Sequence, residues 1–147
     1  MSKKKAVGNK RRRPTSDKVR AQRKKIVKEF FGALGTPREA LKFFAPGAKQ
    51  HNPFVNGGMD SLMESMAAAQ QSMTPEFDDP DFAIKHILVD GNVVAVHTEL
   101  LHSKSRPNEG GLRQVHLFRF GAGNKIVEYW DITQQVTKDL PNPANAF

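Results

Sequence analysis

KIVEYWDITQQ, residues 125–135, is the stretch of sequence that decides the fold. It holds the chain's only Trp, its only Tyr and an acid, Asp131, between two apolar neighbours. β-Branched and aromatic residues dominate it and a turn-forming segment, 121–124, precedes it, so a β-strand is predicted. Because strand side chains alternate, one face carries Val127, Tyr129, Asp131 and Thr133. The other face carries Ile126, Glu128, Trp130 and Ile132. We therefore expect the fold to hold Asp131 in a pocket.

Three more strands are predicted ahead of this one. Residues 82–89 and 92–102 are joined at Asp90-Gly91, a strong hairpin signal. Residues 112–120 follow a loop at 103–111 that is rich in Ser, Arg, Pro, Asn and Gly. Four consecutive strands joined by short connections indicate a mostly antiparallel sheet.

The first half of the chain is predicted to be mainly helical. Apolar residues recur at helical spacing over about 17–34, 36–45 and 60–73. Residues 48–58, with Pro53 and three nearby glycine or asparagine positions, are predicted to form a short strand and a loop. Helices first and strands last indicate an α+β fold, a cone in which N-terminal helices pack in a strongly curved sheet and leave a cavity.

Length and charge divide the chain into two parts. Its 147 residues suffice for one domain, predicted at 16–147, with a basic arm at 1–15. Residues 1–28 carry thirteen Lys or Arg and one acid, a balance of +12. Residues 29–147 carry ten Lys or Arg and fourteen acids, a balance of −4. The overall charge of +8 thus describes a mildly acidic domain with a basic arm.

The basic arm has three interpretations that its sequence leaves open. Lys3 to Arg13 is polar and almost free of large apolar groups, so it is predicted to be disordered. Its Lys/Arg cluster is typical of an import-receptor address or of weak contact with nucleic acid. No aromatic residue interleaves with the charges, so base stacking is not expected. The third interpretation is a solubilising tail.

Several classes of protein are excluded or disfavoured. The absence of Cys excludes disulfides, thiolate zinc sites and a Cys nucleophile. No apolar run is long enough to span a membrane, and no apolar segment completes a secretory signal, so a cytoplasmic location is expected, with the nucleus as the alternative if the arm directs import. Neither paired metal-binding His spacing, nor a phosphate-binding glycine loop, nor a GxSxG elbow is present, so no metal and no cofactor are predicted.

Polar side chains occur where apolar ones are expected. His97 and His116 each lie within an otherwise rather apolar strand face, and His51 lies near Pro53. With Asp131 they are predicted to converge in one cavity, because a few polar groups in an apolar pocket form the usual ligand site. Such a set permits proton transfer, with a His orienting the acid or donating to a developing enolate. The alternative for each His is a satisfied structural group.

Three segments resemble a known family. QHNPFV at 50–55, LFRFGAGNKIVEYWDITQ at 117–134 and NPANAF at 142–147 are similar to the SnoaL-like polyketide cyclases. These proteins belong to the nuclear-transport-factor-2-like superfamily of α+β cone folds. The resemblance runs from about Ser16 to the end and excludes the basic arm. The superfamily also includes isomerases, epoxide hydrolases, dehydratases and proteins that only bind, so the fold does not choose among these functions.

The resemblance implies roles for individual residues. Asp131 corresponds to the acid/base of enzymes that close a ring by cofactor-free intramolecular aldol condensation. His97 corresponds to an assisting pocket histidine, and His51 and Asn52 to cavity-lining residues. Members often have an acid where this chain has His116.

The function predicted from these observations is binding of a small apolar carbonyl compound, with acid-base catalysis of the cyclase, lyase or isomerase type. The predicted catalytic residues are Asp131 and His97. The predicted substrate-binding residues are His51, Asn52, His116, Tyr129, Trp130 and Phe118. The alternative is a non-catalytic ligand- or protein-binding domain with a basic arm. A homodimer is also predicted, because Trp130, Ile126 and Ile132 would leave the outward sheet face apolar.

Overall fold

The computed structural model describes residues 15–73 and 76–142, so the basic arm lies outside it except for its last residue. The Thr15 hydroxyl donates to the Gly91 carbonyl at 3.2 Å. The main elements are α1 (Asp17–Gly32), α2 (Pro37–Leu41), β1 (Phe44–Gln50), α3 (Met59–Gln71), β2 (Asp81–Asp90), β3 (Val93–Leu101), β4 (Gly110–Phe120) and β5 (Ile126–Thr137). Short 3-10 helices at Pro107–Glu109 and Ala122–Asn124 flank β4.

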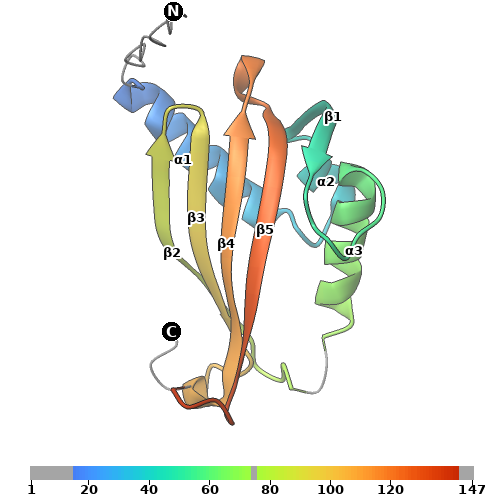
Figure 1. The fold of residues 1–147 in the computed structure, drawn as a ribbon, viewed down its shortest axis with the longest axis vertical. Helices are drawn as coiled ribbons and strands as arrows, with labels where there is room; N and C mark the ends of the chain where they lie inside the picture. The colour runs from blue at the N-terminus through green and yellow to red at the C-terminus, as the bar shows by residue number, and fades with distance from the viewer. Residues whose placement is uncertain (1–14, 74–75, 143–147) are drawn as a thin grey trace, which may run out of the picture.

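The strands form one curved, unclosed sheet of five strands in the order β1-β5-β4-β3-β2. β1 pairs with β5 in parallel, and every other neighbouring pair is antiparallel. Figure 1 shows α1 running behind the long strands β2 to β5, with α2 and α3 beyond β5 next to β1. The predicted α+β fold, with helices packed in a curved and mostly antiparallel sheet, is confirmed.

Helix α1 begins and docks through side chains that the sequence supplies locally. Ser16 caps it by accepting from the Val19 backbone at 3.4 Å. Arg20 and Arg23 then donate to the Val89 and Gly91 carbonyls at the β2–β3 turn. These bonds fix the helix across the inner face of the sheet.

Phe30 of α1 is the centre of the core. It is fully buried, and its ring makes edge contacts with rings from α1, β1, β4, β5 and the segment before β1. The centroid distances are 5.4 Å to Phe31, 6.2 Å to Phe43, 5.5 Å to Phe44, 5.3 Å to Phe118 and 5.9 Å to Tyr129. Edge contacts between aromatic rings stabilise such a core beyond the area that they bury.

Two predictions about elements were wrong in detail. The second helix ends at Leu41 and not near residue 45, because Phe44 already pairs with Ile126 in the sheet. The pairing of β4 with β5 shifts between Arg119 and Phe120, which marks a bulge. The bulge turns Ile126 toward the core, where it is fully buried, so Ile126 does not belong to the outer face with Trp130 and Ile132.

Candidate active site

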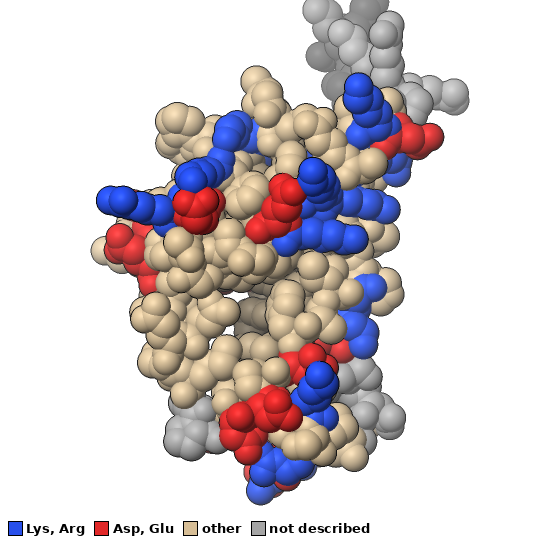
Figure 2. Space-filling model, turned by 180° about the vertical axis from the view of Figure 1, so that it is seen from behind, with Lys and Arg blue, Asp and Glu red and all other residues tan. Residues whose placement is uncertain are grey.

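A cavity of about 790 Å³ lies between the helices and the inner face of the sheet. Figure 2, which views the molecule from the helical side, shows the hollow near its centre. Most of its wall is apolar, formed by Phe31, Leu34, Phe54, Val55, Leu62, Met66, Ala69, Met73, Phe77, Pro80, Phe82, Leu100 and Leu112. The polar lining residues are Asn52, Ser65, Gln70, Ser72, Gln114, Asp131 and Thr133. Asp131 is the one carboxylate among the described residues that line the cavity.

Asp131 reaches the cavity as predicted and is held there by Asn52. The Asn52 side-chain amide donates to Asp131 Oδ2 at 2.6 Å. The orientation of that amide is set by its other end, because Asn52 Oδ1 accepts from the Phe54 backbone at 2.8 Å. Asp131 Oδ1 is buried and has no hydrogen-bond partner. One carboxylate oxygen is therefore fixed by Asn52, while the other is left without a hydrogen-bond partner in the protein.

His116 and Tyr129 form a buried pair behind the cavity wall. His116 is opposite Asp131 in the β4–β5 pairing, but its Nδ1 contacts the Tyr129 hydroxyl, at 2.7 Å. Burial lowers the pKa of His116 to about 4. Burial also raises the pKa of Tyr129 above its ordinary value, and the charge of Asp131 raises it further. Both groups are therefore neutral near pH 7.

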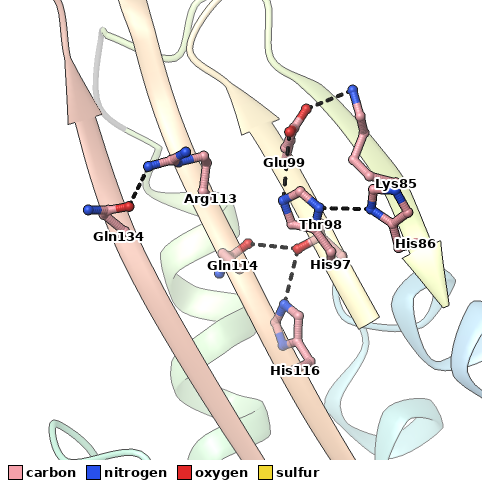
Figure 3. A network of polar contacts seen from close by, with 9 residues as sticks. All are labelled: Lys85, His86, His97, Thr98, Glu99, Arg113, Gln114, His116 and Gln134. Atoms are coloured by element: carbon pink, nitrogen blue, oxygen red, sulfur yellow. Dashed lines mark hydrogen bonds and ion pairs between the residues drawn. The ribbon is translucent and has the colours of Figure 1, made fainter. Parts of the chain in front are cut away.

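Hydrogen bonds connect this pair to the cavity surface. His116 Nε2 lies 3.2 Å from Thr98 Oγ1, and the Thr98 hydroxyl donates over a long 3.5 Å to Gln114 Oε1. The Gln114 amide donates to Thr133 Oγ1 at 3.1 Å. These directions are mutually consistent when the Tyr129 hydroxyl donates to His116 Nδ1 and His116 Nε2–H donates to Thr98. Figure 3 shows the central part of this chain.

Gln114 is a site residue that the sequence prediction missed. The chain of bonds occupies its carbonyl oxygen and one amide hydrogen, which leaves the second amide hydrogen for the cavity that it lines. Its position could have been found from strand alternation, because Gln114 shares a face with His116. A search of the sequence for titratable groups does not find it, because glutamine does not titrate.

His97 does not share the cavity, and that prediction was wrong. His97 is opposite Val115 in the sheet, whereas His116 is opposite Val96, so the two imidazoles point to different faces. Figure 3 shows His97 directed toward His86 and Glu99, on the face away from His116.

His51 and Trp130 also lie on the outer face. Their rings stack with centroids 4.6 Å apart, and His51 Nε2 lies 2.8 Å from Glu128 Oε1. The prediction that His51 lines the cavity was therefore wrong, and Trp130 points away from it because it alternates with Asp131. Phe118 faces inward but is fully buried in the core and does not line the cavity.

Two further classes of feature are absent from residues 15–73 and 76–142. No group of three or more His, Asp or Glu in these ranges is arranged to hold a metal ion. None of the helices in them is long and apolar enough to cross a membrane.

A family model described as a SnoaL-like domain matches residues 27–129, which is well over half of the chain. The chain belongs to the SnoaL-like domain family. The match ends two residues before Asp131, so it does not include that residue, and any role of Asp131 is argued from the geometry of the cavity. A search of curated protein sequences gave no match.

Solved structures of SnoaL-like and related proteins share the fold. An NTF2-like protein of unknown function from Cytophaga hutchinsonii is 16% identical with a TM-score of 0.54, covering 84% of this chain and 94% of that one. SalBIII, an epoxide hydrolase/cyclase-like enzyme with a role in pyran ring formation in polyether salinomycin, is 20% identical with a TM-score of 0.57, covering 78% and 92%. A steroid delta-isomerase from Pseudomonas aeruginosa is 17% identical with a TM-score of 0.54, covering 78% and 80%. At these identities the likeness shows the fold alone.

Proposed function

We propose that the cavity binds a small, largely apolar carbonyl compound and that Asp131 is the acid/base of a cofactor-independent cyclisation or isomerisation. The observation that carries the proposal is that the two oxygens of the Asp131 carboxylate differ in their hydrogen bonds. Asp131 lines the cavity, Asn52 holds its Oδ2, and its Oδ1 has no hydrogen-bond partner in the protein. A carboxylate fixed in this way is positioned for proton transfer, and the apolar wall around it suits a neutral ligand.

The proposed reaction begins when the Asp131 carboxylate takes a proton from a carbon next to a ligand carbonyl. Negative charge then develops on the carbonyl oxygen, and the free amide hydrogen of Gln114 donates to that oxygen. In a cyclisation, the enolate carbon bonds to a second carbonyl carbon of the same molecule, and the resulting alkoxide takes the proton back from Asp131. In an isomerisation, Asp131 returns the proton to a different carbon.

The buried chain of polar groups behind the wall supports this division of roles. Because burial holds His116 neutral, it does not place a positive charge beside Asp131. Instead His116 contacts Thr98, whose hydroxyl donates to Gln114 Oε1 and so occupies the Gln114 carbonyl oxygen. Asp131 is thus an acceptor and Gln114 a donor at the same cavity.

Proton exchange with simple ketones tests the proposal, whichever compound is the natural substrate. A panel of apolar ketones, such as substituted tetralones, is incubated with the full-length chain in D₂O, and deuterium uptake is followed by mass spectrometry. We expect Asp131→Asn to lower the exchange rate of any responsive ketone by roughly 10²–10⁴-fold with its binding retained. The matched control is Glu128→Gln, three positions earlier on β5 but directed to the outer face, which should exchange at the wild-type rate.

The outcomes separate catalysis from binding alone. Undiminished exchange by Asp131→Asn would refute the acid/base role. Ketones that bind the wild-type cavity but show no exchange would instead identify a non-catalytic binding domain, which is the alternative that the sequence left open.

A further inference from the structure

The loop between β1 and α3, residues 51–58, carries the most exposed large apolar side chain in the part of the chain that the structure describes. This side chain is Phe54, which is 94% exposed and yet lines the cavity. Because it is both exposed and part of the cavity wall, Phe54 lies where the cavity opens to solvent. A single exposed apolar residue needs no explanation by itself. Phe54 differs because hydrogen bonds fix its loop and join it to Asp131.

Gln50, the last residue of β1, fixes the shape of this loop. Its side-chain oxygen accepts from the Asn52 backbone at 2.7 Å. Its side-chain nitrogen donates to the Val55 and Gly57 carbonyls, each at 3.0 Å. One side chain thus ties together three loop residues that lie on either side of Phe54. The exposed ring is therefore attached to an ordered segment of backbone.

Asn52 joins Phe54 to the carboxylate of Asp131. Its Oδ1 accepts from the Phe54 backbone at 2.8 Å, and its Nδ2 donates to Asp131 Oδ2 at 2.6 Å. The same side chain thus orients the acid and fixes the backbone that carries the ring. The protein places a phenyl group at the opening of the cavity and leaves it almost wholly uncovered.

We propose that Phe54 is a ligand-binding residue whose ring packs against the apolar part of a compound bound in the cavity. In the free protein the ring contributes almost nothing to the core, because it is exposed. A bound ligand removes the ring from water, so Phe54 contributes to affinity and not to the stability of the free protein. The inference rests on the part of the proposed function that makes this cavity a site for apolar ligands, and it does not depend on the acid/base role of Asp131.

Binding of the fluorescent probe N-phenyl-1-naphthylamine to the full-length chain tests the inference. The probe is neutral and apolar, and it carries no carbonyl group, so its binding does not require proton transfer. We expect Phe54→Ala to raise the Kd of the probe by roughly 10–100-fold, the change that corresponds to burial of one Phe side chain. Phe54→Leu keeps an apolar side chain and should bind the probe more tightly than Phe54→Ala.

The matched control is Leu88→Ala. Leu88 is 67% exposed, but it lies on the outer face of the sheet and does not line the cavity. This variant should bind the probe with the wild-type Kd. Each variant should also keep the wild-type Tm in the absence of the probe, which separates a lost ligand contact from a loss of folding.

The outcomes distinguish this inference from the proposed function. The inference is overturned if the wild type does not bind the probe, if Phe54→Ala binds it as tightly as the wild type, or if Leu88→Ala weakens binding equally. Failure of the proposed function alone gives a different pattern. The probe then binds in a manner that depends on Phe54, whereas no ketone exchanges deuterium or Asp131→Asn exchanges at the wild-type rate.

Discussion

The two faces of the sheet carry the same residue types but give them different chemistry. His116 and His97 lie on neighbouring strands, one residue out of register with each other. The inward ring of His116 is 1% exposed, and burial lowers its pKa to about 4. The outward ring of His97 is partly exposed and lies beside a carboxylate and a second imidazole. The face on which a residue lies, more than its identity, decides what it can do.

The acids of β5 show the same contrast. Glu128, on the outer face, has both oxygens engaged, Oε1 with His51 and Oε2 with Arg119, each at 2.8 Å. Asp131, on the inner face, has one oxygen engaged and one buried without a partner. A satisfied carboxylate stabilises structure, whereas a buried and unsatisfied oxygen is costly unless a ligand or a proton uses it. Because of this difference, we propose the acid/base role for Asp131 on the inner face and not for Glu128 on the outer face.

The largest effect on stability is expected from Phe30→Ala in the core behind the inner face. Phe30 is fully buried against five aromatic rings, so its removal leaves a cavity that the neighbours cannot fill. We expect the free energy of unfolding to fall by about 3–5 kcal/mol, measured by urea denaturation. Phe54→Ala is the matched control, because Phe54 is 94% exposed, and it should change that free energy by no more than about 0.5 kcal/mol. Similar losses in both variants would contradict the described packing.

Periodicity within each strand was readable from the sequence, but the alignment between strands was not. Alternation in β5 correctly placed Asp131 and Tyr129 on one face and Trp130 on the other. It could not reveal which face of β3 matches which face of β4, so His97 was wrongly placed beside His116. The register depends on contacts distant in sequence, and a shift of one residue exchanges the faces.

Local irregularity was the second limit on prediction. The bulge between Arg119 and Phe120 redirects Ile126 into the core, although a regular strand would have left it outside. The role of Gln114 was equally hidden, because it depends on bonds through Thr98 to a buried ring. Such bonds join neighbouring strands and exist only once the sheet has formed.

A smaller effect, of about 3 kcal/mol, is expected from the titration of His116. Its pKa of about 4 in the folded state lies below the ordinary value of 6.5, so the unfolded chain binds the proton more tightly. The stability from neutral His116 is complete above about pH 6.5 and is lost as the pH falls toward 4. The difference between the two pKa values corresponds to about 3 kcal/mol.

Comparison of variants isolates this titration from that of the carboxylates. The free energy of unfolding is measured for the wild type and for His116→Gln at pH 7 and at pH 4. Because glutamine cannot titrate, the wild type should lose about 3 kcal/mol more than the variant between these two pH values. A flat difference for His116→Gln would mean that the buried ring is not held neutral.

The smallest effect on stability, with a distinct effect on assembly, is expected from Ile132→Ser on the outer face. Ile132 is 58% exposed, and Leu88 and Val115 on the same face are 67% and 39% exposed. The homodimer predicted from the sequence would cover this apolar surface, although Ile126 does not contribute to it. Ile132→Ser should change the free energy of unfolding of the monomer by no more than about 0.5 kcal/mol while lowering the sedimentation mass from dimer toward monomer.

The control is Leu140→Ser, because Leu140 is 44% exposed but lies beyond the end of β5, and this variant should sediment as the wild type does. A wild-type chain that sediments as a monomer at all concentrations would refute the homodimer and would leave the outer face to solvent.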